Sequence, residues 1–167
     1  QSHEVIFDAG CGTGVNMILL HDRVRKIVGM DYSESALERC RRRILSKKIE
    51  NLELLQGEIM NVPLPDCSAD KILCMSVLQY LDDAEVRRAF REFARLLKNH
   101  GEVVLHVKNI ASLYLSTLWL AKRLKLLLGG KPKLENFRSF RWYVKELESA
   151  GFQVVTYNSF NLFMIES

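Results

Sequence analysis

Three glycines at two-residue spacing, Gly10, Gly12 and Gly14, follow a short apolar segment near the start of the chain, in the stretch "VIFDAGCGTGVNM". Glycine lets a backbone turn tightly and approach a bound molecule closely. A dinucleotide-binding loop carries its third glycine three positions after the second, and Val15 occupies that position here. The spacing therefore argues against a pyrophosphate loop and a nicotinamide-dependent oxidoreductase, and favours a loop for a smaller adenosine cofactor.

Acidic residues lie at or just after the ends of three predicted strands. Asp8 precedes the glycine turn, where its carboxylate can face an ammonium group. Asp31 ends the second strand, where a carboxylate can accept hydrogen bonds from both hydroxyls of a ribose. Glu58 comes after the third strand and can accept from an exocyclic amine while the Ile59 N–H donates to a ring nitrogen. Each acid alone is more often a solvated turn residue or a helix cap, but together they indicate a nucleoside that carries an amino acid.

Apolar segments that alternate with amphipathic ones must position these residues. Strands are predicted over 5–8, 24–31, 51–57, 69–81 and 102–108, and a closing pair over 152–158 and 161–167. Helices are predicted over 15–22, 32–48, 83–99 and 140–152, with turns at 99–101 and Gly151. We therefore expect an α/β fold: a Rossmann-like, doubly wound, mostly parallel seven-stranded sheet with an antiparallel C-terminal edge hairpin and a helical insertion after strand five.

The composition is that of one globular domain. The 167 residues are 48% hydrophobic, which suffices for a core, and a net charge of +4 is too small to indicate nucleic acid. The four cysteines lack the paired spacing of a zinc site, so no metal is expected.

No apolar run is long enough to span a membrane, and no cleavable signal precedes the first strand. We expect a cytoplasmic protein, with peripheral membrane contact through 113–133 as the one exception.

The motifs, in this order, resemble those of the class I S-adenosylmethionine-dependent methyltransferases. "VIFDAGCGTG" is similar to their first motif, "IVGMDYSESALERC" to the ribose-binding acid and its helix, and "QGEIMNVPLPDCSADKILCMSVLQYL" to the adenine-binding acid, proline loop and fourth strand. "LLKNHGEVVLHVKN" and "YVKELESAGFQVV" resemble the later elements. The resemblance is weakest over 110–137. It implies a single domain over 1–167 that binds S-adenosyl-L-methionine, yields S-adenosyl-L-homocysteine, and lacks the family's usual N-terminal helical segment.

The resemblance also implies which residues hold the methionine and ribose portions of the cofactor. Asp8, Gly10 and Gly12 would contact the methionine portion. Asp31 would bind the ribose. These four residues come from the first two predicted strands and the turn between them.

A second group would surround the adenine and the sulfonium. Tyr32 would lie near the adenine, and Glu58 and Ile59 would read its edge. Glu58 stands where an aspartate is commoner in the family. Ser76, at the end of the fourth strand, would face the cofactor from below.

Methyl transfer from a sulfonium is an in-line displacement, so the site must align the nucleophile, the methyl carbon and the sulfur. An oxygen nucleophile also needs a base. The candidates near the ends of strands four and five are Gln79, Tyr80, His106, Lys108 and Asn109. We predict Tyr80 and Asn109 on the acceptor side. His106 has the best unperturbed pKa for a base, but strand alternation can aim it away from the site, so the catalytic residue is left unknown.

The residues after strand four narrow the class of acceptor. Enzymes that methylate amino groups of nucleic-acid bases or glutamine commonly carry an Asn/Asp-Pro-Pro-aromatic motif there, and this chain has "SVLQY". The strand-four segment is similar instead to enzymes that act on small molecules and lipids. We predict methyl transfer to a small-molecule, lipid or cell-envelope-related acceptor. The alternative is a catalytically inactive S-adenosylmethionine-binding domain that regulates a larger protein or mediates its interactions.

The region after the fifth strand has its own composition. We expect 110–136 to be a cap on the acceptor side. A second interpretation makes 113–133, with Trp119 and clustered basic residues, an interfacial helix on an anionic membrane. Arg138 and Arg141 lie among aromatic residues in "FRSFRWY", a composition that favours packing and solvated charge over a phosphate or RNA site.

Overall fold

The computed structural model describes residues 3–107, 127, 136–157 and 162–166. Its centre is a sheet with the strand order β3-β2-β1-β4-β5-β7-β6. The strands are β1 (Val5–Ala9), β2 (Lys26–Asp31), β3 (Leu52–Gln56), β4 (Ala69–Met75), β5 (Leu97–His106), β6 (Gln153–Tyr157) and β7 (Leu162–Glu166). Strands β1 to β5 run parallel, and β7 pairs antiparallel with both β5 and β6. The predicted Rossmann-like fold with its parallel sheet is confirmed.

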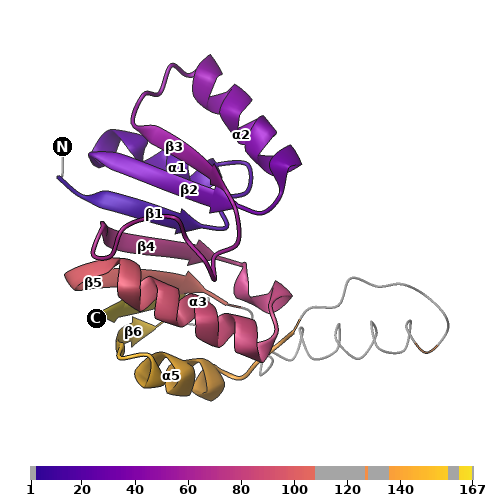
Figure 1. The fold of residues 1–167 in the computed structure, drawn as a ribbon, viewed down its shortest axis with the longest axis vertical. Helices are drawn as coiled ribbons and strands as arrows, with labels where there is room; N and C mark the ends of the chain where they lie inside the picture. The colour runs from indigo at the N-terminus through magenta and orange to yellow at the C-terminus, as the bar shows by residue number, and fades with distance from the viewer. Residues whose placement is uncertain (1–2, 108–126, 128–135, 158–161, 167) are drawn as a thin grey trace.

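Helices connect β1 to β2, β2 to β3 and β4 to β5 and cover the sheet, whereas a loop over 57–68 joins β3 to β4 (Figure 1). They are α1 (Val15–Leu20), α2 (Glu34–Ser46), α3 (Asp83–Leu96) and α5 (Phe140–Ser149), with short 3-10 turns η1 (His21–Arg23) and η2 (Leu78–Tyr80). Helix α2 contacts β2 and β3, whereas α3 contacts β5 and α5. Among the described residues, none of the helices has the length and apolar character needed to cross a membrane.

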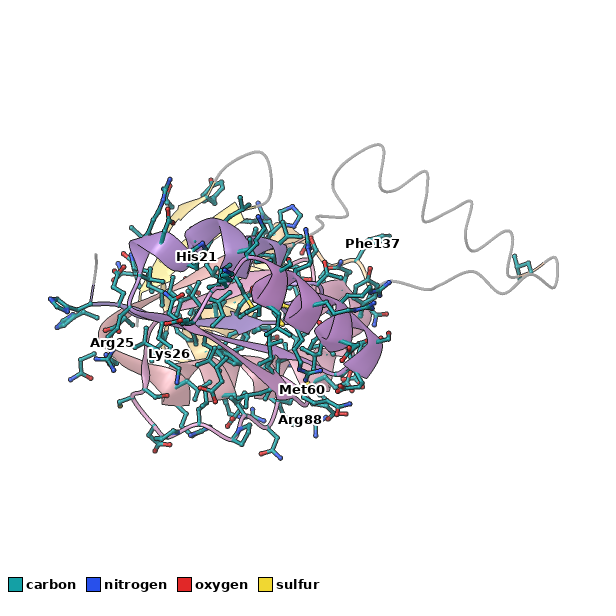
Figure 2. All side chains as sticks on the ribbon, turned by 90° about the horizontal axis from the view of Figure 1, so that it is seen from above. His21, Arg25, Lys26, Met60, Arg88 and Phe137 are labelled. Carbon is teal, nitrogen blue, oxygen red and sulfur yellow. The ribbon has the colours of Figure 1, made fainter. Side chains whose placement is uncertain are left out.

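The two faces of the sheet carry separate hydrophobic cores. Successive residues of β1 divide between them: Ile6 packs with residues of α1 and α2, and Phe7 and Ala9 pack with residues of α3 and α5. Seen from above, side chains fill the molecule on both sides of the ribbon of the sheet (Figure 2). Because strand side chains alternate between faces, Asp8 lies on the same face of the sheet as Ile6.

The fourth strand is shorter than predicted. It ends at Met75, because Ser76 adopts a left-handed backbone with a φ of 61° that an extended strand cannot accommodate. The apolar residues after Ser76 form η2 and not the end of a strand. Gln79 and Tyr80 therefore lie on a tight turn beyond the strand end.

Helix α3 begins at a capping box, in which Asp82 accepts from the N–H of Glu85 and Glu85 accepts from the N–H of Asp82. The helix was predicted to reach residue 99, but it ends at Leu96 because Leu97 is extended and starts β5. The predicted turn at 99–101 is a bulge inside β5, where the pairing with β4 shifts register. The predicted end at Gly151, which has a φ of 91°, is confirmed for the last helix.

The helical insertion, the cap over 110–136 and the interfacial segment over 113–133 fall almost entirely outside the described residues. Asn109 lies outside them as well. The described chain resumes at Asn136, beside η2 and the start of α3.

Candidate functional site

A pocket of about 280 Å³ lies beyond the carboxyl ends of β1, β2 and β4. In sheets of this kind, ligands bind at this edge, where connections diverge to opposite faces. Arg25 and Lys26, at the start of β2, lie toward the opposite end of the molecule from Met60, which lines the pocket (Figure 2). Seven residues that the sequence predicts for the site line this one pocket: Gly10, Asp31, Tyr32, Glu58, Ile59, Ser76 and Tyr80.

The glycine turn is fastened to the end of β2. The N–H groups of Gly10 and Cys11 both donate to the carbonyl of Met30, at 2.8 and 2.9 Å. Gly10 has a φ of 84°, and a Cβ built on it collides with the side chain of Val77, which also lines the pocket. Because its N–H is already used inside the protein, Gly10 offers no backbone donor to a ligand, and its lack of a side chain leaves space for Val77 at the pocket wall.

Asp31 is held in place by two backbone donors. Its Oδ2 accepts from the N–H of Gly12 at 2.8 Å, and its Oδ1 accepts from the N–H of Ser33 at 2.9 Å. The N-cap of α2 is Ser33, whose hydroxyl accepts from the N–H of Ala36. Asp31 is therefore not the cap of that helix. Each carboxylate oxygen keeps a further lone pair with which it can accept a hydrogen bond from a ligand hydroxyl.

Asp8 is buried behind the turn and does not line the pocket. It is 1% exposed, and neither carboxylate oxygen has a hydrogen-bond partner within the described part of the chain. Burial raises the pKa of Asp8 to about 7, and the negative charge of Asp31 contributes to the rise. A buried carboxyl group without a partner is costly unless a proton or a cation neutralises it. This unpartnered group fits the ammonium of a bound amino acid.

Ser76 joins the pocket to His106 on the neighbouring strand. The two strands align Met75 with His106, and the Ser76 N–H donates to the His106 carbonyl at 3.0 Å. The Ser76 hydroxyl lies 2.6 Å from Nδ1 of His106. The amide of the buried Gln79 donates to the Ser76 carbonyl at 2.7 Å. His106 thus lies behind the pocket surface and contacts it through Ser76.

Three carboxylates line the pocket, from Asp31, Glu58 and Glu85, and no lysine or arginine is among its described lining residues. Such a site favours a cationic ligand over a phosphate, because like charges at close range repel. The described residues contain no group of three or more histidine, cysteine or acidic side chains that could hold a metal ion.

Several lining residues were not predicted from the sequence: Gly57, Met60, Met75, Val77, Leu81 and Glu85. Glu85 had a sequence signal, because an acid three residues after Asp82 at a helix start is typical of a capping box. Leu81 and Val77 had none, because an apolar residue after a strand gives no indication that it faces a ligand and not the core.

Comparison with known proteins identifies a family and several relatives for this chain. A family model described as a methyltransferase domain matches residues 6–101. The probable S-adenosylmethionine-dependent methyltransferase Rv3030 of Mycobacterium tuberculosis is 31% identical over 104 residues, which are 62% of this chain and 35% of that protein. A demethylmenaquinone methyltransferase of Listeria monocytogenes is 29% identical over 101 residues, 59% of this chain and 42% of that protein.

Among solved structures, the YcgJ protein of Bacillus subtilis superposes with a TM-score of 0.76 at 24% identity, covering 93% of this chain and 65% of that one. This likeness supports the fold. The chain spans between about a third and two fifths of the length of the Mycobacterium and Listeria relatives.

Proposed function

We propose a function for this chain, which belongs to the class I S-adenosylmethionine-dependent methyltransferases: it binds S-adenosylmethionine in the pocket at the carboxyl ends of β1, β2 and β4 and transfers its methyl group to a small-molecule or lipid acceptor. The observation that carries the proposal is that the site contains two carboxylates in different environments. Asp31 is fixed at the pocket wall by two N–H donors, and Asp8 is buried behind the glycine turn without a partner among the described residues.

These carboxylates match two separate parts of the cofactor. Asp31 accepts from the ribose hydroxyls with the lone pairs that Gly12 and Ser33 leave free. Asp8 attracts the ammonium of the methionine portion, which would neutralise its otherwise costly buried charge. Glu58 and Ile59, which come after β3 and line the same pocket, take the adenine edge.

The acceptor approaches from the wall formed by η2 and the start of α3. Tyr80, Leu81 and Glu85 line the pocket on this side. The cofactor supplies a methyl group on a positively charged sulfur: the nucleophile forms a bond to the methyl carbon while the carbon–sulfur bond breaks and leaves its electron pair on sulfur. The side of the pocket formed by η2 and α3, together with Ser76, would align the nucleophile of the acceptor with the methyl carbon and the sulfur. This alignment supplies much of the rate of such a displacement.

Two features support a small apolar or lipid acceptor. The pocket lining includes the apolar side chains of Met60, Val77 and Leu81, together with the exposed Tyr80. One relative is named for the methylation of demethylmenaquinone, a small molecule. A carboxylate-lined pocket is a poor site for the phosphates of a nucleic acid.

The proposal is tested in two steps. Calorimetry should detect binding of S-adenosylmethionine and S-adenosylhomocysteine, and none of NAD, whose pyrophosphate would meet the three carboxylates of the pocket. Transfer of a labelled methyl group is then sought in a polar metabolite extract and in a lipid extract. Binding of NAD alone would overturn the cofactor assignment. Cofactor binding without transfer to any acceptor, by the full-length protein, would indicate a binding module and overturn the enzymatic part.

A further inference from the structure

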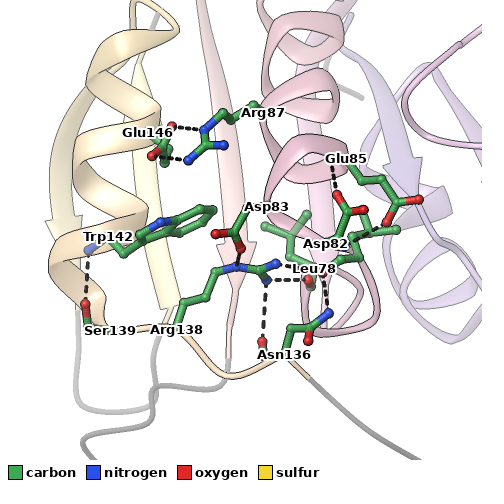
Figure 3. A network of polar contacts seen from close by, with 11 residues as sticks. Leu78, Asp82, Asp83, Glu85, Arg87, Asn136, Arg138, Ser139, Trp142 and Glu146 are labelled. Carbon is green, nitrogen blue, oxygen red and sulfur yellow. Dashed lines mark hydrogen bonds and ion pairs between the residues drawn. The ribbon is translucent and has the colours of Figure 1, made fainter.

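Arg138 is an almost fully buried arginine whose side chain the proposed chemistry does not use. It is 7% exposed, although an arginine normally keeps its charged end in water. Its Nε donates to Oδ1 of Asp83 at 2.7 Å, and its guanidinium lies over the ring of Trp142, 4.7 Å from the centroid (Figure 3). The sequence predicted packing and solvated charge for Arg138; the solvated charge is wrong, because the guanidinium is buried and paired with Asp83.

The other nitrogens of Arg138 hold the backbone of η2. One terminal nitrogen donates to the carbonyl of Leu81 at 2.7 Å, and the other donates to the carbonyl of Leu78 at 3.1 Å. These two carbonyls flank Tyr80, and both Tyr80 and Leu81 line the pocket. A planar guanidinium can bond several acceptors at fixed angles, which an ammonium group cannot do.

Asn136 completes the attachment from the same segment. Its backbone N–H donates to the carbonyl of Gln79 at 2.7 Å, and its side-chain amide donates to the carbonyl of Leu81 at 2.9 Å. Within the turn itself, the N–H groups of Tyr80 and Leu81 donate to the carbonyls three residues earlier. Three carbonyls of η2 and its C-cap, from Leu78, Gln79 and Leu81, are thus held by residues more than fifty positions away. Figure 3 shows Arg138 and Asn136 beside Leu78.

We propose that Arg138 is a positioning residue for the acceptor wall of the pocket, with Asn136 as its helper. It fixes η2 relative to α3, through Asp83, and so sets where Tyr80 and Leu81 stand. This inference rests on the proposed function for its consequence in catalysis, because η2 forms the side from which the acceptor is proposed to enter. Asp31 ends β2 and Glu58 follows β3, and neither is among the hydrogen-bond partners of Arg138 in the described residues.

The structure offers a matched control in Arg87. Its guanidinium pairs with the carboxylate of Glu146 through two hydrogen bonds, of 2.8 and 3.1 Å, and also lies near the ring of Trp142. The pair therefore joins α3 to α5, much as Arg138 joins α3 to the residues just before α5. Within the described part of the chain, the hydrogen bonds of Arg87 do not reach the backbone of η2. A general loosening of α5 would follow from either substitution, whereas loosening of the pocket wall should follow only from loss of Arg138.

The test compares Arg138→Lys, Asn136→Ala and Arg87→Gln with the wild type by amide hydrogen exchange of the segment 78–82. Lysine keeps the charge beside Asp83 but cannot hold both carbonyls. We expect exchange to be about tenfold faster over 78–82 in Arg138→Lys, faster by a smaller factor in Asn136→Ala, and unchanged in Arg87→Gln. The proposal would be overturned if the segment 78–82 exchanged equally fast in the wild type, Arg138→Lys and Asn136→Ala. It would also be overturned if Arg87→Gln raised the exchange rate over 78–82 as much as Arg138→Lys does. Asn136→Ala removes only an exposed side chain, so it keeps the test decisive if Arg138→Lys fails to fold.

A second readout separates this inference from the proposed function. Once an acceptor is known, Arg138→Lys should raise the KM for the acceptor or lower kcat by about tenfold. The dissociation constant for S-adenosylhomocysteine should change by less than about twofold, because Asp31 and Glu58 are untouched. If Arg138→Lys weakened S-adenosylhomocysteine binding by the same factor as it changed KM or kcat, the assignment of Arg138 to the acceptor side would be overturned. If the wild type does not bind S-adenosylhomocysteine at all, the proposed function fails, whereas the exchange result still decides the role of Arg138.

Discussion

The N–H of Gly12 donates to Oδ2 of Asp31 at 2.8 Å and ties the glycine turn to the carboxyl end of β2. The carboxylate that is proposed to bind the ribose is thereby oriented by the glycine turn. This contact makes the two motifs one structural unit, so a substitution at either residue should affect both the loop and the proposed ribose site.

Substitution of Asp31 should weaken binding of the cofactor. Asp31→Ala removes the acceptors for the ribose and frees the N–H groups of Gly12 and Ser33, so the dissociation constant for S-adenosylhomocysteine should rise by roughly 10- to 100-fold. Asp31→Asn keeps one acceptor oxygen and should lose less. Calorimetry measures both, with Asp22→Ala on η1 as the control acid outside the pocket. An unchanged affinity in Asp31→Ala would contradict the ribose assignment.

The contribution of Asp8 to the stability of the free protein should fall as the pH rises between about 4 and 7. The pKa of Asp8 is 3.8 in its ordinary state and about 7 in the fold, so in this window the folded state holds a proton that the unfolded chain has released. The contribution of Asp8 to the free energy of unfolding therefore decreases as the pH rises, by at most about 1.4 kcal/mol per pH unit. Urea unfolding at several pH values should show this slope in the wild type and its absence in Asp8→Asn.

The neighbours of Asp8 do not supply an alternative source of this slope. Burial raises the pKa of the Cys11 and Cys74 thiols, which therefore stay neutral throughout the window. Asp31 contributes a negative charge that raises the pKa of Asp8. Parallel unfolding profiles for the wild type and Asp8→Asn would show that the slope comes from elsewhere.

Binding of the cofactor at pH 6 should release a proton. An ammonium beside Asp8 favours the carboxylate, so the carboxyl group, protonated in the free protein, should ionise on binding. Calorimetric heats of S-adenosylmethionine binding in two buffers of different ionisation enthalpy measure the number released. We expect about one proton for the wild type and none for Asp8→Asn, together with weaker binding by the variant. Equal release by both proteins would separate Asp8 from the ammonium site.

Two substitutions of Ser76 should distinguish its structural role from its role in the pocket. Ser76→Ala loses the hydrogen bond to His106 and keeps the strained φ of 61°, so the free energy of unfolding should fall by about 1 kcal/mol. Ser76→Gly loses the same bond but relieves a strain of about 1–2 kcal/mol, so its stability should match or exceed that of the wild type. Both should weaken S-adenosylhomocysteine binding alike if the hydroxyl faces the cofactor. Unequal binding that tracks stability would refute that role.

The sequence was sufficient for the parallel sheet and for the polar pocket residues at strand ends, because apolar segments mark the strands and polar residues mark their ends. Asp31 and Glu58 were found in this way. The sequence did not identify the apolar residues of the lining, such as Met60 and Val77. The end of β4 was misjudged because the apolar run continues past Ser76, and a left-handed serine leaves no mark in the sequence. The role of Arg138 was missed because its partners are backbone carbonyls about sixty positions away, and every residue type carries a carbonyl.

The close approach of Gly10 to Val77 gives a final prediction about packing at the pocket wall. Gly10→Ala places a Cβ against the Val77 side chain and requires alanine at a φ of 84°, so it should destabilise the fold by about 2–4 kcal/mol. Val77→Ala in the same chain removes the collision but not the backbone strain, so the double variant should recover part of the loss. Urea unfolding of the two single variants and the double variant measures the coupling. Additive effects would mean that the collision relaxes at no cost, and that Gly10 is required for its backbone conformation alone.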